Sequence, residues 1–247
     1  IIDAGFLGKA FCYVYYPKTG KILENGIDRP FAFSPDFEAD LDSHWKLGKY
    51  QIYNKNGKTH FEFLGKKFQV KVQCDNNDNG LSFLCPSTGD NRPFHFTYKN
   101  LLLPTQIQLS QKNQTQTFSD LYGGIDFSKG YPPKHTTWNW TSFLGQLEDG
   151  TPVGINVVDQ FNNNMENAVW IGQERILVGD VSYSYNEPLA KSEWIVKSVN
   201  GDMELKMNPN GSRKENINLK LMKSKFIQVF GAIEGKIKQN ATWKKLT

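Results

Sequence analysis

The 247-residue sequence predicts an all-β protein made of two antiparallel β units in tandem. Three observations lead to this prediction. Apolar and polar residues alternate with a period of two along most of the chain, which is typical of half-buried strands. Short turn signals separate these runs, and no stretch of twelve or more residues shows helical periodicity. The strands are too many for one eight-stranded barrel, so we infer two β units.

The predicted strands follow one another with short turns between them. Apolar side chains alternate with polar ones in residues 68–73, 94–98, 181–185 and 217–221. In the second of these runs, Phe94, Phe96 and Tyr98 alternate with His95 and Thr97. Residue pairs that favour tight turns occur between the runs, at Thr19-Gly20, Asn56-Gly57, Asp149-Gly150, Asn200-Gly201 and Asn210-Gly211.

A polar stretch separates the predicted strands into two groups. Residues 110–116 contain only polar side chains and show no apolar alternation. We therefore expect an N-terminal β domain at 1–117 and a C-terminal β domain at 118–247. Residues 123–133 come next, with glycines near both ends and a double proline. This composition predicts a long structured loop, and loops of that length are often functional.

Composition excludes several classes of protein. Lys and Arg number 29 against 25 Asp and Glu, and a net charge of +4 spread over the chain does not predict nucleic-acid binding. The longest apolar runs are only a few residues, so no integral membrane insertion is expected. Aromatic residues make up 13% of the chain, which predicts a packed core.

The cysteines point to a reducing compartment. Cys12, Cys74 and Cys85 are too few and too scattered for a disulfide framework, although a Cys74–Cys85 bridge across a hairpin is geometrically conceivable. No signal peptide is visible, so the cytoplasm is favoured. The chain starts at Ile1 rather than at Met, and we expect the native N-terminus to lie upstream.

No cofactor or metal site is expected from the motifs. The four histidines are scattered, and the nucleotide-binding and serine-nucleophile patterns are absent. Residues 75–80 match the first half of a calcium loop, D-x-N-x-N-G. The twelfth position should be a bidentate Glu but is Pro86, and strand patterns flank the loop where helices should be. We therefore predict a hairpin turn there.

The densest cluster of candidate site residues follows the predicted loop. If residues 135–141 form a strand, Trp138 and Trp140 share one face, while His135 and Asn139 point the other way. Two indoles on one face either line a hydrophobic calyx or simply fill a barrel.

The two strands that follow add further polar candidates. Asn156, on an interior face of the strand at 153–158, would need a hydrogen-bonding partner, either within the core or on a ligand. Glu166 and Asn167, at the head of the next strand, either order the preceding loop or contribute to a site.

Candidate acids and bases are few. Asp126, Glu166, Asp159 and His135 are the groups able to transfer a proton, and Lys129 is a candidate partner for an anion. Single carboxylates in loops are usually solvated, so none of these carboxylates by itself indicates catalysis.

Several ordered motifs resemble an uncharacterised domain-of-unknown-function family. They are Gly124-Ile125-Asp126-Phe127-Ser128-Lys129-Gly130-Tyr131-Pro132, Thr137-Trp138-Asn139-Trp140, Asp149-Gly150, Val153-Gly154-Ile155-Asn156, Glu166-Asn167, residues 224–231, and residues 5–27 with Tyr16-Pro17-Lys18-Thr19-Gly20. That family is similar to the AttH-like superfamily of tandem lipocalins, which includes carotenoid 1,2-hydratases. The resemblance implies two lipocalin-like antiparallel β-barrels, or strongly curved sheets, packed together, with a hydrophobic pocket at or between them.

Three functional hypotheses follow. The first is a lipocalin-like protein that binds an apolar small molecule or lipid, with Trp138, Trp140, Asn156, Asp126, Lys129 and Tyr131 as ligand-binding residues. The second is a metal-independent isomerase, hydratase or lyase acting on an apolar substrate, with Asp126, Glu166 or His135 as the acid. The third is a structural subunit that binds a protein partner within a larger assembly.

Overall fold

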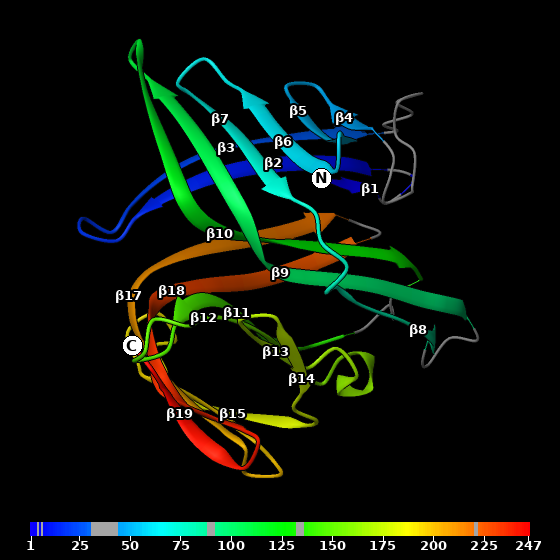
Figure 1. Ribbon diagram of the computed structural model, residues 1–247. Coiled ribbons are helices and arrows are strands. Elements are labelled where there is room, and N and C mark those ends of the chain that lie inside the picture. The colour runs from blue at the N-terminus through cyan, green and yellow to red at the C-terminus, as the bar shows by residue number, and fades with distance from the viewer. Residues whose placement is uncertain (4, 6, 31–43, 88–91, 132–135, 220–221) are drawn as a thin grey trace. The chain divides into compact units, whose positions relative to one another are not determined.

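The computed structural model of the protein describes residues 1–3, 5, 7–30, 44–87, 92–131, 136–219 and 222–247. Within these residues the elements are antiparallel β-strands, together with one short 3-10 turn, η1 (Asn162–Asn164) (Figure 1). The predicted all-β antiparallel class is therefore confirmed. No helix among the described residues is long and apolar enough to cross a membrane.

The chain forms two compact units. The first consists of residues 1–14 and 22–132, and the second of residues 15–21 and 133–247. The strands at Leu7–Tyr16 and Lys21–Pro30 form a hairpin, and the tip of this hairpin therefore belongs to the second unit. The predicted domain boundary after residue 117 falls inside a strand, β10, and remains a prediction.

The first unit contains two sheets in its described residues. A three-stranded sheet has the order β1-β2-β3, and a second sheet has the order β10-β9-β7-β6-β5-β4, with β8 also paired to β9. The strands are β1 (Ile2–Asp3), β2 (Leu7–Tyr16), β3 (Lys21–Pro30), β4 (Trp45–Leu47), β5 (Tyr50–Lys55), β6 (Lys58–Leu64), β7 (Phe68–Asp75), β8 (Leu81–Ser87), β9 (Arg92–Gln111) and β10 (Gln114–Gly130).

The second unit also contains two sheets in its described residues, with the orders β11-β12-β13-β14 and β15-β16-β17-β18-β19. A β-bridge between Leu147 and Leu246 joins them at one corner. The strands are β11 (Asn139–Gln146), β12 (Pro152–Asp159), β13 (Ala168–Ile171), β14 (Glu174–Leu177), β15 (Val181–Tyr185), β16 (Trp194–Ser198), β17 (Met203–Leu219), β18 (Met222–Gln239) and β19 (Thr242–Leu246).

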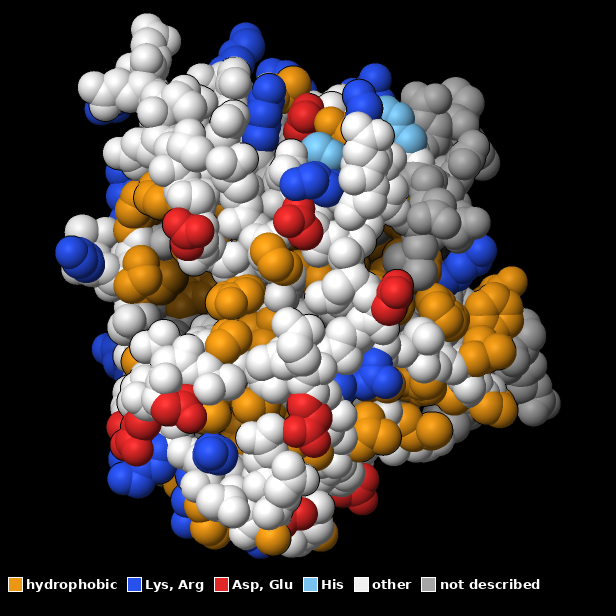
Figure 2. All heavy atoms as spheres, viewed as in Figure 1, with side chains coloured by type: hydrophobic (Ala, Val, Ile, Leu, Met, Phe, Trp, Pro, Cys, Tyr) orange, Lys and Arg blue, Asp and Glu red, His pale blue; other side chains and the backbone are white. Residues whose placement is uncertain are grey.

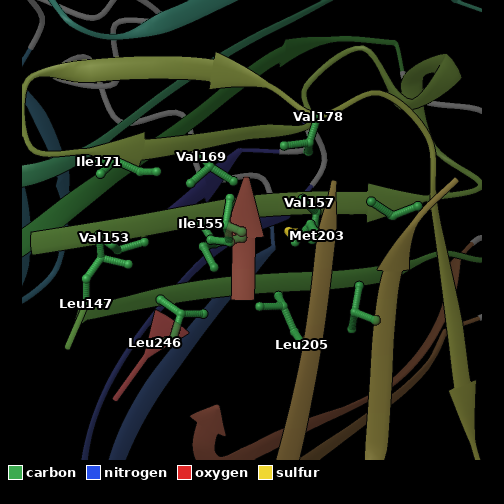
Figure 3. Packing of buried hydrophobic residues seen from close by; sticks show 13 residues of the cluster. Leu147, Val153, Ile155, Val157, Val169, Ile171, Val178, Met203, Leu205 and Leu246 are labelled. Carbon is green, nitrogen blue, oxygen red and sulfur yellow. The ribbon is translucent and has the colours of Figure 1, made fainter. Parts of the chain in front are cut away.

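The core of the second unit contains side chains from both of its sheets. Val153, Ile155 and Val157, at alternate positions of β12, are completely buried and belong to this cluster. Met203 and Leu205 of β17 meet them from the other sheet (Figure 3). Burying a side chain of this size contributes about 1.5–3 kcal/mol, so this cluster is a main source of the unit's stability.

The core of the first unit is built around aromatic rings. Tyr50 stacks on Phe63 with ring centroids 4.7 Å apart, and its hydroxyl donates a hydrogen bond to Asn25 at 2.6 Å. Cys12 of β2 lies in the same cluster. Burial raises the pKa of the Cys12 thiol to about 12. Burial, with the nearby charges of Cys12 and Glu24, also raises the pKa of Tyr50 to about 12.

Residues 123–130, predicted as part of a loop, instead form the end of β10 and pair with β9. Gly123 and Gly124 lie at a β-bulge. Leu102 in β9 has a φ of +59° and is left unpaired between Leu101 and Leu103. Leu101 pairs with Gly124, where a Cβ atom would lie 2.4 Å from the Leu101 Cδ2 atom. Gly124 therefore allows the Leu101 side chain to come close to the backbone of β10 at the bulge. Glycine is needed here for this close approach and not for a loop.

The predicted turn at Asn210-Gly211 is also wrong, because both residues lie within β17 at a break in its register with β18. Tyr15 belongs to the hairpin tip, residues 15–21, which is part of the second unit. Its hydroxyl donates a hydrogen bond to Asn210 Oδ1 at 2.5 Å. Its ring stacks on Phe230 with centroids 4.6 Å apart. A Cβ atom on Gly211 would lie 2.7 Å from the Tyr15 ring, so the glycine makes room for that ring.

The other four predicted turns are present between strands. Residues 76–80 connect β7 to β8. These two strands do not pair with each other but follow one another along the same edge of β9, so the predicted hairpin turn is wrong and the segment is a connection between two successive strands. The three cysteines are free and buried, including Cys74 and Cys85. Among the described residues, no group of His, Cys, Asp and Glu side chains is arranged to hold a metal ion.

Alkaline pH should weaken the first unit through Cys12. Its pKa is raised from 9.0 to about 12, so the folded protein keeps a proton that the unfolded chain loses. Between these values the unfolded state binds fewer protons, and the free energy of unfolding should decrease as pH rises. Tyr50, raised from 10.0 to about 12, should add to this decrease. Urea denaturation across this pH range measures the slope.

Cys12→Ala is the informative variant for this prediction. It should flatten the decrease above pH 9.0, because one of the groups with a raised pKa is gone. A slope equal to that of the wild type would show that Cys12 does not contribute.

Candidate functional site

Trp138 and Trp140 lie on the surface of the second unit. Trp138 is 49% exposed and precedes β11, and Trp140 is 42% exposed within β11. Phe143, at a position of the opposite parity in β11, packs against the core. The two indoles therefore do not fill this core. Figure 2 shows hydrophobic side chains at the surface, beside charged ones, on the face in view.

A chain of hydrogen bonds fixes the Trp140 ring. Its indole N–H donates to Asn156 Oδ1 at 2.9 Å. Asn156 is 2% exposed, and its amide donates in turn to the backbone carbonyl of Glu166 at 2.9 Å. The buried side chain of Asn156 thus has the hydrogen-bonding partners expected from the sequence, Trp140 at its oxygen and the Glu166 carbonyl at its nitrogen. Trp140 is exposed on one side and held in a fixed orientation on the other.

Asn167 holds the loop after β12 in place. Its side-chain Oδ1 accepts a hydrogen bond from the backbone N–H of Val158 at 2.7 Å, and its Nδ2 donates to the Val158 carbonyl at 3.0 Å. The same Nδ2 donates to the Gly179 carbonyl at 2.8 Å. The pairing of β12 with β13 ends at Asn156 and Ala168. The amide of Asn167 therefore replaces a strand partner for the next part of β12 and orders the loop.

That loop brings an aromatic side chain to Trp138. The centroid of Phe161 lies 5.9 Å from that of Trp138, with the rings tilted by 41°. The loop bends sharply, since Gln160 and Asn164 both have positive φ angles. We call Trp138, Trp140 and Phe161 the aromatic surface. Phe161 was not among the predicted site residues, because nothing in its local sequence distinguishes it from a core residue.

The residues considered for proton transfer in the second unit do not share one location in the structure. Glu166 is 2% exposed, at the base of the loop that carries Phe161. His135 lies outside the described residues. Asp159 is the last residue of β12. The catalytic roles considered for these residues remain predictions.

Asp126, Lys129 and Tyr131 belong to the first unit, on or just after β10. Asp126 accepts a hydrogen bond from Lys99 at 2.6 Å, and this lysine side chain is only 8% exposed. Lys129 pairs with Phe96 across the strands. Tyr131 is 46% exposed and lies edge-on to Phe94 at 5.9 Å. The predicted ligand-binding residues thus form two groups, one in each unit.

Sequence reasoning missed Lys99, the partner of Asp126. It also treated His95 and Thr97 only as the polar positions of an alternating strand. In the structure His95, Thr97 and Lys99 are 6%, 0% and 6% exposed, whereas the aromatic residues between them are only partly buried. Alternation showed that the strand has two different faces, but it did not show which face is buried.

Comparison with known proteins identifies the family of this chain. The family model described as a domain of unknown function (DUF2804) matches residues 1–245. The chain belongs to the DUF2804 family. This confirms the resemblance to an uncharacterised family that the sequence motifs indicated. No curated protein matches the sequence.

Two solved structures share the fold. One is the AttH protein NE1406 from Nitrosomonas europaea, with a TM-score of 0.57 and 12% identity over 98% of this chain and 80% of that one. The other is kievitone hydratase from Nectria haematococca, with a TM-score of 0.62 and 10% identity over 99% of this chain and 79% of that one. The predicted likeness of this DUF2804 chain to AttH-like proteins is confirmed for the fold, which is what identities of 12% and 10% show.

Asn167→Ala should destabilise the protein by about 3 kcal/mol, because it leaves the N–H and carbonyl of Val158 and the carbonyl of Gly179 without partners. Urea denaturation measures this loss. Asn216→Ala, at an exposed position of β17, is the control and should change the free energy of unfolding by less than about 0.5 kcal/mol. Equal effects of the two substitutions would contradict the role given to Asn167.

Proposed function

We propose that this DUF2804 protein binds an apolar small molecule on the aromatic surface formed by Trp138, Trp140 and Phe161. The observation that supports this most strongly is the hydrogen bond from Trp140 to the buried Asn156 at 2.9 Å. It holds a large, 42% exposed aromatic side chain in one orientation. Exposed aromatic area that is already ordered loses little conformational entropy when a ligand covers it, so more of the burial free energy appears as affinity.

The expected ligand is largely apolar. Covering an aromatic side chain of this size contributes about 1.5–3 kcal/mol, and a planar or ring-containing ligand gains further by stacking. One structural neighbour is named a hydratase of kievitone, which supports an organic molecule as ligand. A shared fold alone is a weak argument for function, so the proposal depends on the residues.

A second candidate function is proton-transfer catalysis on the bound molecule. Glu166 is 2% exposed and contributes its backbone carbonyl to the chain of hydrogen bonds that ends at Trp140. Its side chain is buried at the base of the loop that carries Phe161, and carboxyl groups are among the side chains that act as general acids and bases in enzymes. Glu166→Gln separates the two functions, because a binding protein should retain its ligand whereas an enzyme should lose turnover. Liquid chromatography coupled to mass spectrometry, applied to a metabolite extract incubated with the protein, would detect a product that differs in mass by one water, or an isomer of unchanged mass with a new retention time.

Binding of the neutral dye Nile red tests the first function. In the wild type its fluorescence should increase and saturate as the dye leaves water for the aromatic surface. The double substitution of Trp138 and Trp140 by Ala should weaken binding at least about tenfold, because most of the apolar contact area is lost.

Trp243→Ala is the matched control. Trp243 is a 38% exposed tryptophan of the same unit, but the amino groups of Lys236 and Lys238 lie over its ring at 4.4 and 5.0 Å. Its removal should leave dye binding unchanged. Equal affinity in the wild type and the double variant, with both proteins folded by circular dichroism, would rule out the aromatic surface as the binding site.

A further inference from the structure

The first part of β10 is an open edge of the larger sheet in the first unit. Among the residues that the structure describes, β10 pairs with β9 on one side and is the last strand in the order of that sheet (Figure 1). Residues 114–120 are all exposed, and Phe118 is 42% exposed although it is aromatic. The backbone on the outer side of this segment is therefore accessible to another strand.

The turn between β9 and β10 determines which backbone groups point outward. Lys112 and Asn113 have φ angles of +46° and +64°, which is the type I′ conformation of a two-residue hairpin loop. The two residues that flank such a loop exchange hydrogen bonds, and bonded pairs then alternate with non-bonded pairs along the strands. Thr115 and Thr117 thus direct their N–H and C=O groups away from β9.

The sequence of this edge does not contain the residues that normally prevent strand addition. Edge strands are protected by charged residues and prolines, and residues 113–119 contain neither. Uncharged segments with a high β propensity are also the ones that pair with copies of themselves. A break in the register with β9 comes only after Phe118, so residues 114–118 form a regular strand that is able to pair.

The charges at the two ends of this segment favour a second copy of the same chain as its partner. Lys112 precedes the segment and Asp120 follows it. When two copies pair as antiparallel strands with Gln116 opposite Gln116, Lys112 of each copy comes beside Asp120 of the other. The same register places Thr115 opposite Thr117. The outward backbone groups of the two copies therefore meet, and they form about four hydrogen bonds.

We infer that β10 is a dimer interface, at which residues 114–118 of two copies of this chain pair as antiparallel strands about a two-fold axis at Gln116. The contact uses the same surface on both copies, so it closes at two copies and does not continue into a fibre. Phe118 lies opposite Gln114 of the second copy, which covers part of its exposed ring. So short a strand pair is smaller than the interface of a stable complex, and we expect a dissociation constant of about 10–100 μM.

This interface does not depend on the ligand binding proposed above. It lies in the first unit and uses none of Trp138, Trp140 or Phe161. Failure of one proposal therefore leaves the other unaffected, and the two are tested with different variants.

Cysteine substitution at the two-fold axis tests the register. Gln116→Cys should form a disulfide-linked dimer under mild oxidation, because directly opposed residues have Cα atoms about 4.5 Å apart, within the range of a disulfide. Gln114→Cys is the matched control, since its two copies are about 14 Å apart in this register and are too distant for a disulfide. The three native cysteines are buried, so the wild type should remain uncross-linked on a non-reducing gel.

Sedimentation velocity measures the association without a cross-link. The wild type should change from monomer to dimer between about 1 and 300 μM. Thr117→Pro should weaken association about tenfold or more, because proline removes an outward N–H from both strands while the bonded pairs with β9 remain. The inference is overturned if the wild type stays monomeric over this range, if folded Thr117→Pro associates as the wild type does, or if Gln116→Cys and Gln114→Cys cross-link equally.

Discussion

The hydrogen bonds between the side chain of Asn167 and the backbone of Val158 organise one corner of the second unit. They continue the ladder of β12 after its partner strand has turned away, so a loop is held to a sheet by one amide group. Because the loop is held, the Glu166 carbonyl stands where Asn156 donates to it, and Asn156 in turn orients Trp140. An exposed aromatic side chain is thereby fixed from the interior of the protein.

Much of this architecture was predictable from the sequence. The period-two alternation indicated strands such as β7, β12 and β15, and four of the five glycine-containing turns lie between strands. The errors involved glycine. Gly124 and Gly211 lie within strands because a neighbouring side chain occupies the space that a Cβ atom would take. Sequence alone does not separate this use of glycine from its use in turns, since the neighbour, Leu101 in one case and Tyr15 in the other, is distant along the chain.

The candidate sites were less predictable than the fold. Asn156 was identified because a polar residue between apolar ones needs a partner, and that partner exists. His95, Thr97 and Lys99 were overlooked because polar positions in an alternating strand normally face water. On β9 the polar face is the buried one. Which face of a strand is covered is determined by the surrounding structure, so it is not contained in the local pattern.

The hairpin formed by β2 and β3 limits how segments of the gene for this protein could be exchanged or duplicated. Its tip, residues 15–21, belongs to the second unit, whereas the residues before and after it belong to the first. Neither unit is therefore a contiguous stretch of gene. Exchange or duplication of the sequence for residues 133–247 alone would leave Gly211 and Phe230 without the Tyr15 ring that fills the space beside them. The second unit therefore depends on a segment that lies far upstream of it in the chain, and a single family model matches residues 1–245.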